Sequence, residues 1–443
     1  MNPISSSVRD CLKIARLLLA AIGLFCFVHQ ATAAPKRPNI VLIMADDLGA
    51  ECLQSYGSTS YKTPHLDALA ASGIRFETCY STPLCSPTRV QLMTGRYGFR
   101  TGWTQLIGRG SGADDDRKEY FDFTKERTFG HMLREAGYAT AMAGKWQLAE
   151  FQQHPDHVRQ SGFDEYSCWM WLWDGKKTDR YWKPVIWQNG SKREDVADRY
   201  GEDVFVEFLV DFMRRHREKP FFVYYPMTLV HDPFLPTPDS DAAINKMKNA
   251  PKNFADMVAY MDKVVGRLAS ALDELKLREN TLILFTGDNG TPKQITSRVG
   301  DLEIRGGKGQ VAHVGSHVPL IANWKGTAPA GKVCTDLVDL SDVFPTLAEL
   351  AGVELPRRPV IDGRSFAPQL RGQAGQPRDW IFSQLGNRRL AREQRYLLHD
   401  DGRLFDIPND PLETKDLGDS ADPEIVAAKK RLQAALDRLK PTR

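Results

Sequence analysis

The segment NIVLIMADD, residues 39–47, is a continuous apolar run that ends in two carboxylates, Asp46 and Asp47. An apolar run without polar alternation is typical of a strand that is buried on both faces. Strands that alternate with amphipathic helices favour an α/β fold with a mostly parallel sheet. Similar apolar runs return at residues 138–143, 221–225 and 281–286.

Two of the intervening helices carry boundary signals. Thr63-Pro64 opens one helix and Gly73 closes it, because threonine caps a helix and proline suits its first turn. A second helix is predicted at residues 128–136, and Gly137 stops it. These signals agree with the alternating pattern.

Polar side chains follow each predicted strand. In open α/β sheets, ligands bind outside the carboxyl ends of the strands. Four strands that each deliver functional groups to that edge predict one shared site. The groups are Asp46 and Asp47, Lys145 and Trp146, His231, and Asp288 and Asn289.

The chain changes character after about residue 350, where prolines become frequent. A short hairpin is predicted from residues 396–398 and 404–406 around Asp401-Gly402. Residues 423–440 form an amphipathic helix that we expect to pack on this small sheet. The predicted division is a signal peptide at 1–33, a catalytic domain at 34–350 and an α+β subdomain at 351–443.

The N-terminal residues predict export. Basic residues precede an apolar run at 17–28, and Ala31-Thr32-Ala33 offers a cleavage site. The run is short for a membrane span, so a cleaved secretory signal is favoured over an uncleaved anchor. We expect a secreted or periplasmic protein without a membrane segment after cleavage. The net charge of +3 and the lack of a basic stripe argue against nucleic acid as a partner.

Cys85 is the most informative of the seven cysteines. Removal of the signal leaves five, an odd number without metal-type spacing. Ser86 and Pro87 suit the cap and first turn of a helix, so Cys85 is predicted just before a helix N-terminus, where negative charge is favoured. Arg89, one turn further on, can reach back towards it.

Cys85-x-Pro-x-Arg89, followed by Thr-Gly-Arg at 94–96, resembles the signature of formylglycine-dependent sulfatases. The resemblance implies a large mixed sheet between helices, with a smaller C-terminal antiparallel sheet and one helix. It also implies that a formylglycine-generating enzyme oxidises Cys85 to formylglycine, which hydrates to a geminal diol. The resemblance extends from Pro38 to Leu417 and includes 38–40, Gly144-Lys145-Trp146, 286–290, 306–309, 404–406 and 409–411.

The oxygen ligands at the strand ends predict a hard divalent cation. The resemblance assigns Asp46, Asp47, Asp288 and Asn289, together with modified residue 85, to one Ca²⁺ ion, with Mg²⁺ as the alternative. Without a cation, three crowded carboxylates would repel each other.

The resemblance also implies catalytic roles. Lys145 and Lys308 hold sulfate oxygens, and His231 is the general acid towards the leaving group. A diol hydroxyl on residue 85, helped by Asp288 and the metal, attacks sulfur, the alcohol leaves, and the second hydroxyl expels sulfate.

Two departures from the family pattern stand out. Gln147 replaces the usual histidine after Gly-Lys-Trp, and glutamine cannot accept a proton at neutral pH, which puts the release step in doubt. Downstream of Lys308, His313 and His317 stand where Glu and Arg are common, and His313 is a candidate for the missing base.

A tryptophan-rich region suggests the substrate. Trp169, Trp171 and Trp173 are spaced by two, which predicts one strand face, with Trp182 and Trp187 nearby. They either pack in the core or stack on sugar rings, and the second interpretation predicts a sulfated carbohydrate substrate beside aryl sulfates. The alternatives are a phosphodiester or phosphonate hydrolase of the wider superfamily and a catalytically impaired glycan-binding protein.

Overall fold

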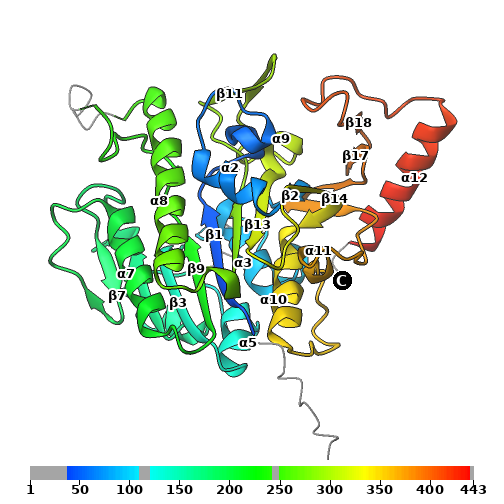
Figure 1. Ribbon diagram of the computed structural model, residues 1–443. Helices are drawn as coiled ribbons and strands as arrows, with labels where there is room; N and C mark the ends of the chain where they lie inside the picture. Colours follow the sequence, from blue (N-terminus) through cyan, green and yellow to red (C-terminus); the bar gives the residue numbers. More distant parts are fainter. Residues whose placement is uncertain (1–36, 109–119, 242–248, 440–443) are drawn as a thin grey trace, which may run out of the picture. The chain divides into compact units, whose positions relative to one another are not determined.

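The NIVLIM run forms β1 (Asn39–Ala45), which lies inside a ten-stranded sheet (Figure 1). The computed structural model describes residues 37–108, 120–241 and 249–439. The predicted signal peptide at 1–33, with Cys11 and Cys26, lies outside the described residues. In the described ranges, no helix has the length and apolar composition that crossing a membrane requires.

The large sheet is mixed and mostly parallel around its centre, as predicted. β10, β1, β9, β3 and β4 are consecutive parallel neighbours, whereas β13 runs antiparallel to both β10 and β2. The strand order is β14 (Lys332–Asp339), β2 (Ile74–Tyr80), β13 (His317–Trp324), β10 (Thr281–Gly287), β1, β9 (Phe221–Pro226), β3 (Ala139–Lys145), β4 (Glu165–Trp169), β7 (Ile186–Gln188) and β8 (Ser191–Lys192).

Helices cover both faces of this sheet, which explains the continuous apolar run of β1. Ile40, Leu42 and Met44 enter one core, and the alternate residues Val41 and Ile43 enter the other. The first core includes α3 (Cys85–Thr94), α5 (Phe129–Glu135) and α10 (Val343–Ala351), and the second includes α2 (Pro64–Ala71), α7 (Gly201–Arg215) and α8 (Phe254–Glu274).

The predicted C-terminal sheet and helix are present. Leu398 pairs with Leu404 in the expected hairpin. One face of the sheet packs on α12 (Pro423–Arg438) through Leu432 and Leu436, and the other face packs against Tyr80 at the end of β2. The division at residue 350 stays a prediction. The strands are β15 (Ile381–Leu385), β16 (Arg388–Arg392), β17 (Tyr396–His399) and β18 (Leu404–Asp406).

The three closely spaced tryptophans do not share one strand face, so that prediction was wrong. β4 ends at Trp169, and Trp173 belongs to β5 (Leu172–Trp173), which pairs with β6 (Lys176–Lys177) in a separate hairpin. Asp174 and Gly175 form its turn, with φ of 50° and 70°. An Asp-Gly pair with both φ values positive is the preferred two-residue hairpin turn, and it interrupts the apparent alternation.

Short elements complete the described structure. They are α4 (Gly98–Thr101), α6 (His157–Gln160), α9 (His313–Ser316), α11 (Ala367–Leu370), β11 (Thr296–Val299), β12 (Leu302–Arg305) and the 3-10 helices at Ala50–Cys52, Gln54–Tyr56, Pro251–Asn253, Arg278–Asn280 and Leu340–Asp342.

Candidate active site

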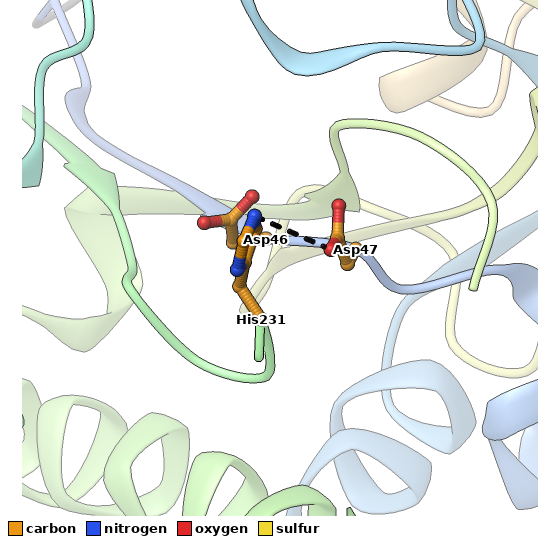
Figure 2. Close-up of side chains that lie close together, drawn as sticks. All are labelled: Asp46, Asp47 and His231. Atoms are coloured by element: carbon orange, nitrogen blue, oxygen red, sulfur yellow. Dashed lines mark ion pairs between the residues drawn. The ribbon is translucent and has the colours of Figure 1, made fainter. Parts of the chain in front are cut away.

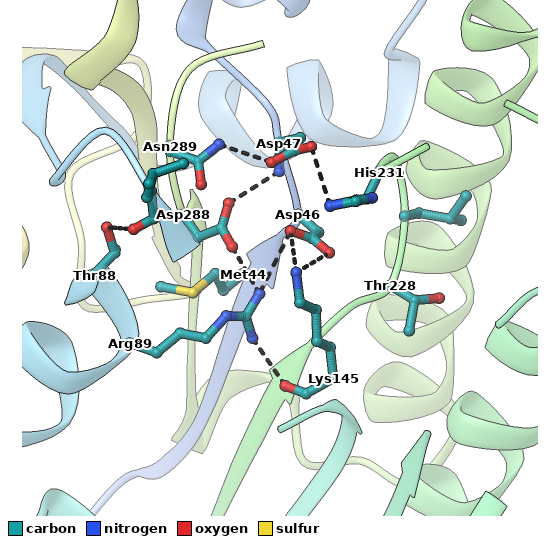
Figure 3. Close-up of polar contacts among 12 residues, drawn as sticks. Met44, Asp46, Asp47, Thr88, Arg89, Lys145, Thr228, His231, Asp288 and Asn289 are labelled. Atoms are coloured by element: carbon teal, nitrogen blue, oxygen red, sulfur yellow. Dashed lines mark hydrogen bonds and ion pairs between the residues drawn. The ribbon is translucent and has the colours of Figure 1, made fainter. Parts of the chain in front are cut away.

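The carboxyl ends of four neighbouring strands meet at one place. Because β10, β1, β9 and β3 are parallel and adjacent, the residues that follow them lie together. Figure 3 shows the resulting cluster, in which carboxylates and cations alternate. It contains Asp46 and Asp47 after β1, Lys145 at the end of β3, His231 after β9, and Asp288 and Asn289 after β10.

Cys85 is the first residue of α3, so the helix begins two residues before the predicted start at Pro87. Leu84, with extended backbone, is the cap, and Ser86 is not. The Ser86 hydroxyl accepts a hydrogen bond from the Ile107 amide at 3.3 Å, which draws it away from the helix end. The Cys85 side chain is buried, and burial raises the pKa of its thiol even though Lys145 lies close enough to oppose this. An unmodified thiol here is therefore a poor nucleophile.

Three cations hold the carboxylates in place. Lys145 Nζ contacts both oxygens of Asp46, at 2.9 and 2.7 Å. Arg89 Nη2 donates to Asp288 Oδ2 at 2.7 Å and its Nη1 donates to the Lys145 carbonyl at 2.9 Å. Lys308 Nζ contacts Asp47 Oδ2 at 2.5 Å. Burial disfavours the charged form of Asp46, but Lys145 and neighbouring cations lower its pKa below its usual range.

The oxygen-rich donors fit a hard divalent cation. Ligand atoms of Asp46, Cys85 and Asp288 lie within 4.8 Å of one another, as do those of Asp46, Asp47 and His231 (Figure 2). Asn289 donates its amide to Asp47 Oδ1 at 2.8 Å, but its own Oδ1 is buried without a hydrogen-bond partner among the described residues. An orphaned buried oxygen needs a partner, and a metal ion supplies one. Burial and the nearby Asp46 charge raise the pKa of Asp288 to about 7, a repulsion that a cation relieves.

His231 presents one ring nitrogen to Lys308. Its Nδ1 lies 2.6 Å from the Asp232 carbonyl oxygen, which only accepts, so Nδ1 carries a proton. Nε2 lies 3.0 Å from Lys308 Nζ. Burial, together with the charge of Arg180, lowers the pKa of His231. In the neutral ring, Nε2 therefore accepts a hydrogen bond from the Lys308 ammonium group.

Two buried residues that the sequence analysis did not identify hold the His231 loop. Glu202, in the first turn of α7, accepts hydrogen bonds from the Thr228 and Leu229 amides at 2.7 and 3.0 Å. Tyr181 donates its hydroxyl towards the carbonyls of Thr228 and His231, at 2.7 and 2.5 Å. Their only sequence signal is a lone acid and a lone tyrosine, which have no motif around them.

A cleft of about 420 Å³ opens beside Lys145 and His231. Gln147 lies on its wall with φ of 53°, and its Oε1 is buried without a hydrogen-bond partner in the described structure. Arg180, also missed from the sequence, places Nη1 3.6 Å from Asp46 Oδ2. The lining residues are Lys145, Gln147, Trp169, Trp171, Lys177, Thr178, Asp179, Arg180, His231, Asp232, Pro233 and Leu235.

The remaining candidates lie elsewhere. His313 contacts the Tyr80 hydroxyl at 2.6 Å and its ring stacks on His317 at 4.7 Å, and neither histidine lines the cleft. Trp173, Trp182 and Trp187 also do not line it, so only Trp169 and Trp171 are placed for contact with a ligand there. The five cysteines of the described ranges are free thiols.

Comparisons with known proteins agree on one family. The family model described as Sulfatase matches residues 38–353. N-acetylgalactosamine-6-sulfatase of dog (Canis lupus familiaris) is 32% identical over 377 residues, which are 80% of this chain and 69% of that protein. Human (Homo sapiens) arylsulfatase D is 27% identical, with 90% of this chain and 79% of that protein covered.

A solved structure has the same fold. The crystal structure of Ps i-CgsB in complex with k-i-k-neocarrahexaose has a TM-score of 0.77 and 27% sequence identity. The match covers 92% of this chain and 94% of that chain. The described fold, including the small C-terminal sheet, is therefore that of a characterised group of structures.

Proposed function

Since the chain belongs to the sulfatase family, whose members hydrolyse sulfate esters, we propose that it acts on sulfated carbohydrates through a formylglycine made from Cys85. The observation that carries the proposal is the position of Cys85. It is buried at the start of α3, where Lys145 and Lys308 are close enough to influence its charge and where Asp46 and Asp288 lie beside its sulfur. A cysteine that is inert as a thiol and surrounded by anion-binding groups suits conversion to another nucleophile.

The modified residue and the cation supply the parts that ordinary side chains cannot. Hydrated formylglycine supplies a nucleophilic hydroxyl, and Ca²⁺, or Mg²⁺ as the alternative, supplies positive charge next to the sulfate oxygens. Asp46, Asp47, Asp288 and Asn289 are the residues that would hold the cation with residue 85. The free Oδ1 of Asn289 supports this assignment.

The lysines and Arg89 bind and orient. Lys145 and Lys308 each lie beside one of the metal-site carboxylates, at 2.7 and 2.5 Å, so their ammonium groups border the place where sulfate oxygens would lie. Positive groups that are already fixed where negative charge develops often contribute more to catalysis than any other effect. Arg89 acts through other residues, because its guanidinium donates hydrogen bonds to Asp288 and to the Lys145 carbonyl and so fixes their positions.

His231 delivers a proton to the leaving oxygen. Its Nδ1 proton is engaged by the Asp232 carbonyl, so the transferable proton belongs on Nε2. Lys308 Nζ, at 3.0 Å from Nε2, keeps its own proton, because against the effect of burial the Asp47 carboxylate raises the pKa of its ammonium group. A sugar alkoxide is a poor leaving group, and protonation of the departing oxygen lowers the barrier to cleavage of the ester.

The cleft supports a carbohydrate substrate. Trp169 and Trp171 line it, and because Arg180 stacks on the Trp169 ring, Trp171 is the aromatic side chain left to contact the apolar face of a sugar ring. The structurally similar Ps i-CgsB was crystallised with k-i-k-neocarrahexaose, and a related enzyme is named for N-acetylgalactosamine 6-sulfate. The N-terminal segment supports export to a secreted or periplasmic location, where such glycans are met. A formylglycine-generating enzyme is the partner that maturation requires.

The deciding experiment measures sulfate release. The chain is co-expressed with a formylglycine-generating enzyme, and matched Cys85→Ala protein serves as the control. The panel contains sulfated glycans, an aryl sulfate, a phosphodiester and a phosphonate. We expect sulfate release that disappears in Cys85→Ala. Hydrolysis of only the phosphorus esters would favour the superfamily alternative, and glycan binding without turnover, with formylglycine confirmed by mass spectrometry, would favour an impaired binding protein.

A further inference from the structure

Arg180 lies in the wall of the cleft, yet the proposed mechanism does not use it. Its side chain is 13% exposed, and its guanidinium carbon lies 4.3 Å from the centroid of the Trp169 ring. The stacking fixes a long side chain that is otherwise flexible, and guanidinium groups stack well on indole faces. A fixed cation beside the reacting centre can recognise a substrate group.

The residues after Arg180 attach it to the loop that carries His231. The Tyr181 hydroxyl donates to the carbonyls of Thr228 and His231, and Trp182 Nε1 donates to the Pro236 carbonyl at 2.8 Å. Arg180 is therefore held on the side of the site where the leaving group departs. Any part of the substrate that it touches lies near the scissile ester oxygen.

Two donors in this wall lack hydrogen-bond partners, although one of them belongs to the longer ion pair with Asp46. Arg180 Nη1 and Trp171 Nε1 are buried and make no hydrogen bond within the described ranges. A buried donor without an acceptor costs free energy, and most such groups in native proteins are satisfied. Both belong to residues that line the cleft, so oxygen atoms of a bound ligand are suitable acceptors.

The charges along the wall balance. Of the three cations that line the cleft, Lys145 is paired with Asp46 at 2.7 Å, and Lys177 and Arg180 are offset by Asp179 and Asp232. Asp46 Oδ2 also lies 3.6 Å from Arg180 Nη1 and shares its charge. A wall without net positive charge does not favour a second anionic group, so the oxygen recognised here is an uncharged hydroxyl.

Resting on the proposed function, we propose that Arg180, supported by Trp171, determines specificity by donating a hydrogen bond to a free hydroxyl next to the scissile sulfate ester. The preferred substrate is then a sugar unit that carries one sulfate and a neighbouring free hydroxyl. A unit with a second sulfate at the neighbouring carbon is disfavoured.

The first test uses matched substrates and the matured wild-type enzyme. Three glycosides carry the same scissile sulfate, with a hydroxyl, a hydrogen or a second sulfate at the neighbouring carbon. We expect kcat/KM to fall about tenfold or more when the hydroxyl is removed, because a charged donor loses its acceptor. It falls for the disulfated sugar as well. Equal rates for the hydroxyl and deoxy sugars, or preference for the disulfated sugar, would overturn the proposal.

The second test separates recognition from chemistry. In Arg180→Met, the difference between the hydroxyl and deoxy sugars disappears, and kcat/KM for the hydroxyl sugar falls further than kcat/KM for nitrophenyl sulfate, which has no such hydroxyl. Arg199→Met is the matched control, because Arg199 is a partly exposed arginine that pairs with Glu207 away from the cleft. An equal loss on both substrate types in Arg180→Met would mean that Arg180 acts on the sulfate or the catalytic groups instead.

A binding experiment keeps the two proposals distinguishable. If the matured enzyme releases no sulfate from any panel member, the proposed function fails, but recognition can still be measured by calorimetry on Cys85→Ala protein. We expect the hydroxyl sugar to bind about tenfold more tightly than the deoxy sugar, and Arg180→Met in this background to remove that difference. Equal dissociation constants would refute the role of Arg180.

Discussion

Replacing Glu202 tests whether a buried carboxyl group positions the general acid. Glu202 is fully buried in the first turn of α7, and its Oε1 accepts hydrogen bonds from two amides of the loop that ends at His231. The Thr228 hydroxyl also donates to it, at 2.5 Å, and the Tyr225 hydroxyl donates to Oε2. Burial raises the pKa of this carboxyl group. The group serves as an acceptor and touches no reacting atom.

The magnitude follows from the groups that lose a partner. Glu202→Ala leaves two buried backbone N–H groups without an acceptor, and each such group costs about 1–3 kcal/mol. The free energy of unfolding should therefore fall by about 2–6 kcal/mol. Glu202→Gln keeps one oxygen for those amides, and we expect a loss of about 1 kcal/mol. A loop displaced by about 1 Å can reduce turnover about 100-fold without large changes in binding.

The assay compares two leaving groups. The sugar oxygen needs a proton from His231 when it leaves, whereas nitrophenolate departs readily without one. In the Glu202 variants, kcat for the glycan sulfate should therefore fall far more than kcat for nitrophenyl sulfate. Asp203→Asn is the matched control, because this neighbouring acid bonds to the Tyr260 hydroxyl at 2.8 and 3.0 Å and not to the loop. An equal loss on both substrates in Glu202→Gln, or no loss on either, would refute the positioning role.

Three further predictions concern the same region. Gln147→His restores a proton acceptor beside the cleft and should raise steady-state turnover relative to the first turnover in rapid-quench measurements; an unchanged ratio would show that release does not depend on this position. His157 is buried between the Trp146 indole N–H and the Phe121 carbonyl, both at 2.8 Å, and burial lowers its pKa from 6.5 to about 4. Its neutral form therefore contributes fully to stability above pH 6.5, and about 3 kcal/mol of the free energy of unfolding is lost as the pH falls from 6.5 to about 4. Urea titrations at several pH values should show this loss of stability in the wild type but not in His157→Gln. Adding Ca²⁺ to chelator-treated protein should raise Tm, because Ca²⁺ at 100 times its Kd adds about 2.7 kcal/mol to the free energy of unfolding. Asn289→Leu should reduce this rise in Tm. An unchanged Tm after Ca²⁺ addition would argue against the site.

The sequence predicts the frame of the site because strand burial and strand ends are local signals. A run such as 39–44 is apolar throughout because helices cover both faces of its sheet. Thr128 caps α5 through the His131 amide, whereas Thr63, the predicted cap of α2, precedes that helix without a side-chain cap hydrogen bond. Once the strands are parallel neighbours, their polar C-terminal residues must converge, so the sequence predicts which residues lie together at this edge of the sheet.

The residues that the sequence could not identify act over distance. Glu202 bonds to an amide 26 residues away, and Arg180 Nη1 lies 3.6 Å from Asp46 Oδ2 although the two residues are far apart in the sequence, so neither relation has a spacing that a pattern can show. The tryptophan alternation misled because the Asp174-Gly175 turn, a local signal, outweighs it. Likewise, serine is a common helix cap, but the Ser86 hydroxyl accepts a hydrogen bond from the Ile107 amide and does not cap α3.

The architecture around His231 separates two tasks that are usually discussed as one. Glu202 holds the loop through the amides of Thr228 and Leu229, and Tyr181 holds it through the carbonyls of Thr228 and His231. Arg180 is next to Tyr181 in sequence, so the guanidinium group that we propose to recognise the substrate is held close to the loop that carries His231. A substrate that fits Arg180 poorly therefore also sits poorly against His231, and specificity should be expressed in kcat as well as in KM.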